Sequence, residues 1–184
     1  TKESFTDDGW FMTGDLVVQD EKGYFKIIDR KKAIICTAVG KNIAPAKLEN
    51  LFSTSSYIEQ VFFVGDERNF ITALVVPNFN YFIDLFNKEG IAINKSDFVM
   101  DDSSGVAICT KVGDDFVNNP RLMELVKKEV DAANQHLESF EQIKNYTILN
   151  ERFTEINGML TPSQKTKKRV ILERFAPQID NMYK

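Results

Sequence analysis

Two short polar motifs in the first part of the chain bring together a carboxylate and a guanidinium. Residues 13–15 (TGD) place Asp15 at an expected strand end, and a carboxylate can accept hydrogen bonds from both vicinal hydroxyls of a ribose. Residues 29–32 (DRKK) add Arg30, which could orient Asp15 or bind the same ribose. Taken alone, the first motif is more typical of a surface turn and the second of a solvated run of charge.

Two further motifs lie on expected loops. Residues 39–45 (VGKNIAP) form a glycine turn, which lets backbone approach a narrow ligand, although an ordinary strand-to-helix loop has the same pattern. Glu49 is then expected as a first-turn carboxylate of the following helix. Residues 160–169 (LTPSQKTKKR) hold Lys165, and a lysine on a flexible loop can reach a phosphate. A solubilising tail and a nucleic-acid patch are the alternatives for this basic cluster.

Composition excludes several classes of protein. The chain of 184 residues has a net charge of −4, which disfavours general nucleic-acid binding because contacts to phosphate dominate that affinity. Cys36, Cys109 and His136 are scattered, so neither a zinc site nor a disulfide framework is expected, and both thiols should be reduced. No apolar run approaches the roughly 18 residues that a membrane span needs.

Apolar patterning predicts the elements that carry these motifs. Strands are expected, in chain order, at 10–18, 24–28, 33–39, 61–64, 71–76 and 146–149. Helices are expected at 45–52, 79–86, 119–137 and, in a short form, 170–175. The first two strands flank the turn signal DEKG and should form a hairpin, whereas residues 91–118 follow no clear pattern and are expected to be partly loop.

This order predicts an α+β fold, with a small mixed β-sheet and flanking helices preceded by a β-hairpin. The charged segment 29–32 is the only such joint between two apolar strand-like segments in this part of the chain. We therefore expect a domain boundary there, with residues 1–31 on one side and residues 32–184 on the other.

The four motifs in this order and spacing resemble the adenylate-forming superfamily of acyl-CoA synthetases, luciferases and adenylation domains. The resemblance rests on GWFxTGD, GYFxIxDRKK, GKNIAP and LTPSxK, and it runs from about Phe5 to the C-terminus. The GKNIAP and LTP forms are most similar to the long-chain fatty acid–CoA ligases. The resemblance implies a C-terminal lid, residues 32–184, preceded by the end of a large N-terminal domain that binds ATP and the acid.

In that family the acid first attacks the α-phosphate of ATP, and coenzyme A then displaces AMP after the lid has rotated. By resemblance, Asp15 binds the ribose hydroxyls, Arg30 supports that contact and Lys32 is the hinge. Gly40 and Lys41 match the loop that enters the site for the thioester step, and Lys165 matches the lysine of the adenylation step. Because the phosphate loop, the acyl pocket and the Mg²⁺-binding carboxylate are missing, the chain is expected to be an inactive fragment of a longer ligase.

The match departs from the family at some positions. Many relatives carry glycine just before the catalytic lysine, where this chain has Gln164, and Lys167 and Lys168 are near enough to be alternative assignments. Val39 stands where some relatives carry a lysine used in the second step.

The expected cofactors and partners also follow from the resemblance. They are ATP, Mg²⁺, coenzyme A, a fatty acid and the chain's own N-terminal domain, in a cytoplasmic protein with no nucleic-acid partner and no metal ligands of its own. Peripheral membrane contact and homo-oligomers stay open. A ligase for another carboxylic acid and a non-catalytic interaction module of the same fold are the alternatives.

Overall fold

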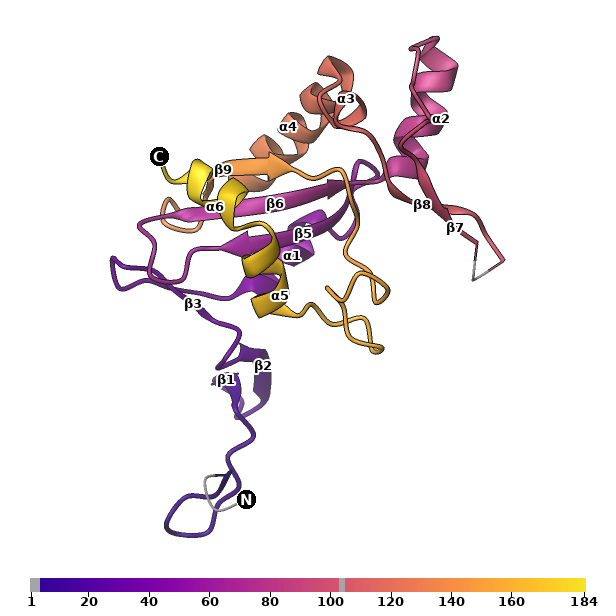
Figure 1. Ribbon diagram of the computed structural model, residues 1–184. Coiled ribbons are helices and arrows are strands. Elements are labelled where there is room, and N and C mark those ends of the chain that lie inside the picture. Colours follow the sequence, from indigo (N-terminus) through magenta and orange to yellow (C-terminus); the bar gives the residue numbers. More distant parts are fainter. Residues whose placement is uncertain (1–3, 103–104) are drawn as a thin grey trace.

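A computed structural model describes residues 4–102 and 105–184 of the chain. A three-stranded sheet with helices on both faces forms the main body, and an N-terminal hairpin extends away from it (Figure 1). This mixed α+β architecture confirms the fold class predicted from the sequence. Within the described residues no helix is long and apolar enough to cross a membrane.

The strands and helices occur in the following order along the chain. The strands are β1 (Asp15–Gln19), β2 (Phe25–Arg30), β3 (Ile35–Cys36), β4 (Asn42–Ile43), β5 (Ile58–Val64), β6 (Ile71–Pro77), β7 (Val99–Asp101), β8 (Ile108–Lys111) and β9 (Ile143–Ile148). The helices are α1 (Pro45–Phe52), α2 (Phe79–Glu89), α3 (Asp114–Val117), α4 (Pro120–Asn134), α5 (Lys168–Arg174) and α6 (Ala176–Met182).

The main sheet has the strand order β5-β6-β9, with β6 in the centre. β6 pairs antiparallel with β5 and parallel with β9, so the sheet is mixed. Every residue of β6 is buried, because α1 and α4 cover one face of the sheet while α5 and α6 lie on the other (Figure 1). Coverage of both faces explains why β6 has an unbroken apolar run rather than an alternating pattern.

The hairpin β1–β2 has the opposite character. Its strands are antiparallel, as the DEKG turn predicts, but almost all of their side chains are exposed. Trp10 is 74% exposed, Tyr24 72% and Phe25 70%. The hairpin therefore has the hydrogen bonds of a sheet without a core of its own.

Residues 91–118 are partly loop, as expected, and they also contain the antiparallel pair β7–β8 and the short helix α3, which the sequence did not predict. Two expected helices need correction. The long helix α4 ends at Asn134 rather than Leu137. The C-terminal helical segment divides at Phe175 into α5 and α6, because Pro177 stands in the first turn of α6 and has no N–H to donate to a carbonyl of α5.

Candidate functional site

The structure brings Asp15 and Arg30 together at the base of the hairpin. The two residues are Cα partners across β1 and β2, and Arg30 Nε lies 3.2 Å from Asp15 Oδ1. Gly14 has φ +75°, a conformation that glycine adopts without strain, and its carbonyl accepts a hydrogen bond from the Lys31 amide at 2.8 Å. The Thr13 hydroxyl accepts a bond from the Asp15 amide at 3.2 Å. The TGD motif is thus a turn that fixes where the carboxylate points.

This ion pair positions the carboxylate more than it stabilises the fold. The Arg30 side chain is 72% exposed and that of Asp15 26%, and exposed pairs contribute little to stability. Within the described residues, Asp15 Oδ2 has no hydrogen-bond partner. That oxygen is therefore available to a hydroxyl of a ligand.

The glycine turn lies between the short strands β3 and β4. Gly40 has φ +77°, and its amide donates to the Thr37 carbonyl at 2.9 Å, while the Lys41 amide donates to the Thr37 hydroxyl at 3.1 Å. The ammonium of Lys41 lies over the ring of Phe140, 5.0 Å from its centroid. Such a cation–π contact holds the side chain beside the turn rather than in free solution.

Lys165 lies on a second tight turn, which is closed by an isolated bridge between Leu160 and Thr166. Its amide donates to the Thr161 hydroxyl at 3.1 Å, and its carbonyl accepts from the Thr161 amide at 2.8 Å. Gln164 has φ +60°, in the left-handed region, so glycine's usual conformation is kept at the position where relatives carry glycine. In the described parts of the chain the ammonium of Lys165 has no ion pair and is exposed.

The neighbouring lysines differ from Lys165. Lys168 is bound to Asp66 in an ion pair, and the same carboxylate accepts a hydrogen bond from the Cys36 amide at 2.9 Å. Burial by itself would raise the pKa of Asp66, but these bonds outweigh it and hold that pKa below its usual value. Lys167 is exposed like Lys165. Lys168 is therefore the least suitable of the three to reach a ligand.

A groove of about 560 Å³ adjoins Lys165 and is lined by α1, the start of β5 and the lysine turn. It contains two carboxylates whose pKa values are raised, Glu49 and Glu59. Burial is the main cause for both, and the negative charge of Asp29 adds to it for Glu49. Glu59 is ion-paired with Arg152, whereas Glu49 has no ion pair among the described residues.

A second cavity, of about 340 Å³, lies at the expected hinge. Arg30 and Lys32 line it together with Glu49, Thr166 and Lys168. Residues before the hinge thus share this cavity with the segment that follows Lys165.

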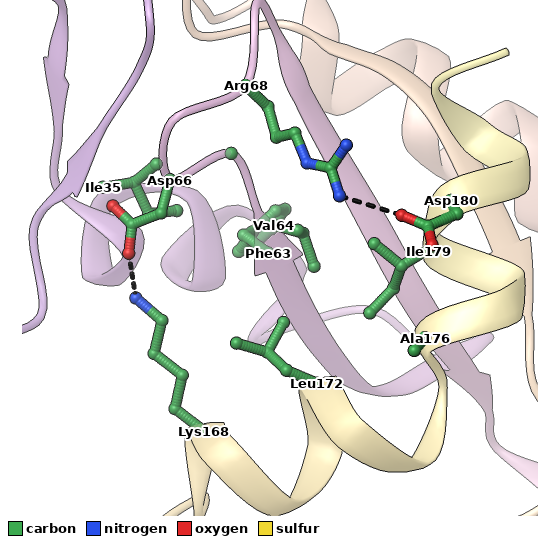
Figure 2. A pocket seen from close by; sticks show the side chains of 11 residues that line it. Ile35, Phe63, Val64, Asp66, Arg68, Lys168, Leu172, Ala176, Ile179 and Asp180 are labelled. Carbon is green, nitrogen blue, oxygen red and sulfur yellow. Dashed lines mark hydrogen bonds and ion pairs between the residues drawn. The ribbon is translucent and has the colours of Figure 1, made fainter.

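A third cavity, of about 240 Å³, lies between the β5–β6 turn and the C-terminal helices (Figure 2). Two ion pairs stand at its rim, Asp66 with Lys168 and Arg68 with Asp180, the second at 2.9 Å. Figure 2 shows that both pairs link the β5–β6 turn to a helix, so they fasten α5 and α6 to this end of the sheet.

The two candidate loops lie at opposite ends of β5. The Lys165 turn shares its groove with Ile58–Val61 at the start of the strand. The glycine turn lies at the other end, where the Ala38 amide donates to the Arg68 carbonyl at 2.9 Å. A strand of seven residues is about 20 Å long, so the two loops cannot reach one point at the same time.

One contact was missed from the sequence. Asp29, assigned there only to a charged joint, accepts a hydrogen bond from the Ala46 amide at the start of α1. The signal was present: Ala44 occupies the N-cap position and has no side-chain acceptor. Glu49, expected in the first turn of that helix, lies one turn further on, because the helix begins at Pro45.

Neither a metal site nor a disulfide occurs in the part of the chain that the structure describes. No group of three or more histidine, cysteine, aspartate or glutamate side chains there could hold a metal ion. Both cysteines are free: Cys36 is exposed and Cys109 is buried, which raises the pKa of the Cys109 thiol.

The sequence profile of the AMP-binding enzyme C-terminal domain family matches residues 32–94 and 100–184. The chain is 39% identical over 183 residues to the long-chain-fatty-acid–CoA ligase FadD15 of Mycobacterium tuberculosis, covering 100% of this chain and 28% of that protein. It is 34% identical over 184 residues to the human long-chain-fatty-acid–CoA ligase 1, covering 100% of this chain and 24% of the relative. The chain thus spans about a quarter of the length of these curated relatives.

Solved structures show the same fold. The adenylation domain of a carboxylate reductase from Mycobacterium chelonae matches with a TM-score of 0.69 and 23% identity, covering 100% of this chain and 24% of that one. The corresponding domain from Segniliparus rugosus, in complex with AMP and a co-purified carboxylic acid, matches with a TM-score of 0.67 and 25% identity. It covers 100% of this chain and 25% of that one.

Proposed function

The chain belongs to the AMP-binding enzyme C-terminal domain family, and from that premise we propose that it is the lid of a long-chain fatty acid–CoA ligase. In this proposal, residues 32–184 form the lid and residues 1–31 are the end of the large domain that precedes it. The start of the family match at residue 32 supports that division. Two relatives, at 39% and 34% identity, are long-chain-fatty-acid–CoA ligases, which supports the choice of a long-chain fatty acid as substrate.

One observation carries the proposal. The Asp15–Arg30 pair lies on one side of Lys32, while the lysine and glycine turns lie on the other side, at opposite ends of β5. A single rotation about Lys32 can then deliver first Lys165 and later Gly40 to a ligand held by Asp15. Two loops about 20 Å apart on one rigid body suit two successive reactions at one site.

In the first half-reaction, a carboxylate oxygen of the acid attacks the α-phosphorus of ATP and pyrophosphate leaves. Asp15 Oδ2 would accept a ribose hydroxyl while Arg30 holds the other carboxylate oxygen. The Lys165 ammonium, which has no ion pair in the described segments, would neutralise negative charge as the carboxylate and the α-phosphate approach. Closure of the lid would also keep water from the acyl-adenylate.

In the second half-reaction, the sulfur of coenzyme A attacks the acyl carbon and AMP leaves. Gly40 lacks a side chain, so its backbone can come close to the narrow pantetheine arm, and Lys41 lies beside it. The AMP complex of the Segniliparus rugosus domain supports a nucleotide ligand for this fold. We assign Mg²⁺, as the companion of ATP, to carboxylates of the upstream segment rather than to this chain.

The exposed hairpin supports the upstream domain as partner. Trp10, Phe11, Tyr24, Phe25 and Ile27 are all at least 61% exposed and form an apolar surface that a covering domain would bury. A cytoplasmic location, peripheral membrane contact and self-association stay predictions.

The test uses the full-length protein with Lys165→Ala and, as a matched control, Lys167→Ala. We would follow palmitate-dependent pyrophosphate release and, separately, thioester formation from pre-made acyl-adenylate. Lys165→Ala should slow the first step by about 10²–10³ and spare the second, because one aligned charge in a transition state has about that effect. Lys167→Ala should change neither step.

Other results would change the assigned residue, substrate or function. If Lys165→Ala leaves both steps intact, its assigned role is wrong and Lys167 takes its place. If the wild type releases pyrophosphate with another acid only, the fold and mechanism stand and the substrate is corrected. If no acid supports release, the non-catalytic module is the better interpretation.

A further inference from the structure

Helix α1 lacks an N-cap of its own. Ala44 has the extended backbone of an N-cap, but its methyl group cannot accept a hydrogen bond, and Pro45 begins the helix. The first amides of a helix have no acceptor within it, and a cap side chain normally serves the second or third of them. Ala46 is the second helical residue. Its amide donates instead to Asp29 Oδ2, 17 residues earlier in the chain, at 3.3 Å.

A β-bulge turns Asp29 toward this helix. In the β1–β2 ladder Leu16 pairs with Asp29 but Val17 pairs with Ile27, so Ile28 is an extra residue on β2. Bulges of this kind bend the strand and redirect the side chains near them. The other oxygen, Asp29 Oδ1, accepts a bond from the Arg30 amide at 2.7 Å, so the carboxylate is held in place from the hairpin side.

The bond between Asp29 and Ala46 crosses the expected hinge. Asp29 belongs to the hairpin, and Ala46 belongs to the body that rotates. The hairpin leads into the main body through a tight turn, in which the Ala33 amide donates to the Arg30 carbonyl at 2.9 Å. A large rotation about Lys32 would carry the start of α1 away from Asp29 and break the bond.

We propose that Asp29 is a positioning residue that holds the lid in the observed pose by capping α1 across the hinge. The proposal rests on the proposed function, since only a lid that alternates between two poses has use for a contact specific to one of them. Capping bonds of this kind typically change an equilibrium constant by about 2- to 30-fold. That range biases a two-pose equilibrium without locking it.

The charge of Glu49 opposes this contact. It lies three residues after Ala46, on the same side of α1, and the charge of Asp29 adds to burial in raising the pKa of Glu49. The observed pose therefore brings two carboxylates near each other. Their repulsion opposes the cap, so the net preference for the pose is smaller than the cap alone would produce.

The experiment uses the full-length protein with Asp29→Ala, Asp29→Asn and, as a control, Glu21→Ala. Glu21 is an exposed acid on the tip of the same hairpin with no ion pair among the described residues. Two quantities would be measured: the rates of the two half-reactions, and hydrogen exchange of a peptide containing the Ala46 amide. Pro45 has no amide hydrogen, so the residue before Ala46 contributes nothing to the exchange of that peptide.

Asp29→Ala should raise the rate of one half-reaction and lower that of the other, changing their ratio by about 2- to 30-fold. It should also speed Ala46 exchange. Asp29→Asn should have a smaller effect, because an amide oxygen still accepts the bond, and Glu21→Ala should match the wild type.

Equal loss of both half-reactions, or unchanged Ala46 exchange in Asp29→Ala, would overturn the proposal. The exchange measurement needs no turnover. A wild type without ligase activity would therefore refute the proposed function, while Ala46 exchange still decides whether Asp29 caps α1.

Discussion

The hairpins β1–β2 and β5–β6 are built alike and packed in opposite ways. Both are antiparallel pairs rich in strand-forming apolar residues. Every residue of β6 is buried, whereas Phe25 and Ile27 of β2 are 70% and 66% exposed. An isolated two-stranded hairpin is marginally stable in water, and a large exposed apolar patch usually marks an interface. One hairpin thus forms the core of its own domain, whereas the other leaves its apolar side chains exposed within this chain.

The largest effect should come from paired truncations in the two hairpins. Leu74→Ala in β6 should lower the free energy of unfolding by about 2–5 kcal/mol, because Leu74 is 0% exposed and its loss leaves a cavity. Ile27→Ala in β2 should change it by less than about 0.5 kcal/mol, as for other exposed positions. Urea unfolding of the 184-residue chain measures both.

The same pair in the full-length protein sharpens the comparison. If an upstream domain covers the hairpin, Ile27→Ala should then cost clearly more than in the short chain. Equal costs for Ile27→Ala in both proteins would mean that nothing covers this surface.

A smaller effect is expected from one turn of the β1–β2 hairpin and one turn of the main body of the chain. The β1–β2 turn places Gly23 at φ +86°, while the Lys165 turn places Gln164 at φ +60°. Gln164→Gly should stabilise residues 32–184 by up to about 1 kcal/mol, since a side chain in this region is strained. Gly23→Ala should loosen its hairpin for the same reason without changing the melting temperature of residues 32–184.

Melting curves and amide exchange of β2 distinguish these two effects. A lower melting temperature in Gly23→Ala would show that the hairpin contributes to the stability of residues 32–184. The conclusion that the β1–β2 hairpin adds nothing to the stability of the main body would then be wrong.

The smallest effect concerns the interaction between Asp29 of the β1–β2 hairpin and Glu49 of α1. Burial, together with the charge of Asp29, raises the pKa of Glu49 in the folded state. The ionised form of Glu49 therefore lowers the free energy of unfolding. Glu49 therefore lowers stability as pH rises from its unfolded pKa through the raised folded value. Glu49→Gln should stabilise the protein by a few tenths of a kcal/mol at pH 7, because Glu49 is only partly buried and water screens much of the charge effect.

The advantage of Glu49→Gln should vanish below about pH 4, where the wild-type side chain is protonated in both states. Urea unfolding across this pH range tests the sign. An advantage that persists in acid would show that packing rather than charge is responsible.

Local signals predicted most of the elements correctly. Asn78 and Asn119 accept hydrogen bonds from the first turns of α2 and α4, and Gly90 ends α2 in the left-handed conformation, as their positions in the sequence suggest. The pair β7–β8 was not predicted, because its strands are only three and four residues long and half exposed. Such short segments have too few residues for a period to emerge.

The sequence by itself determined the residue types, the order of the motifs and the turns at Gly14, Gly40 and Lys165, because these depend on backbone conformations that a few neighbouring residues specify. Tertiary structure alone decided which groups meet. Pairing of β1 with β2 sets Arg30 beside Asp15, and the length of β5 separates the lysine and glycine turns. The bulge at Ile28 lies beside Asp29, which accepts the bond from the start of α1 that Ala44 cannot accept, across the proposed hinge. Such contacts depend on the register and packing of segments distant in sequence, which no local pattern encodes.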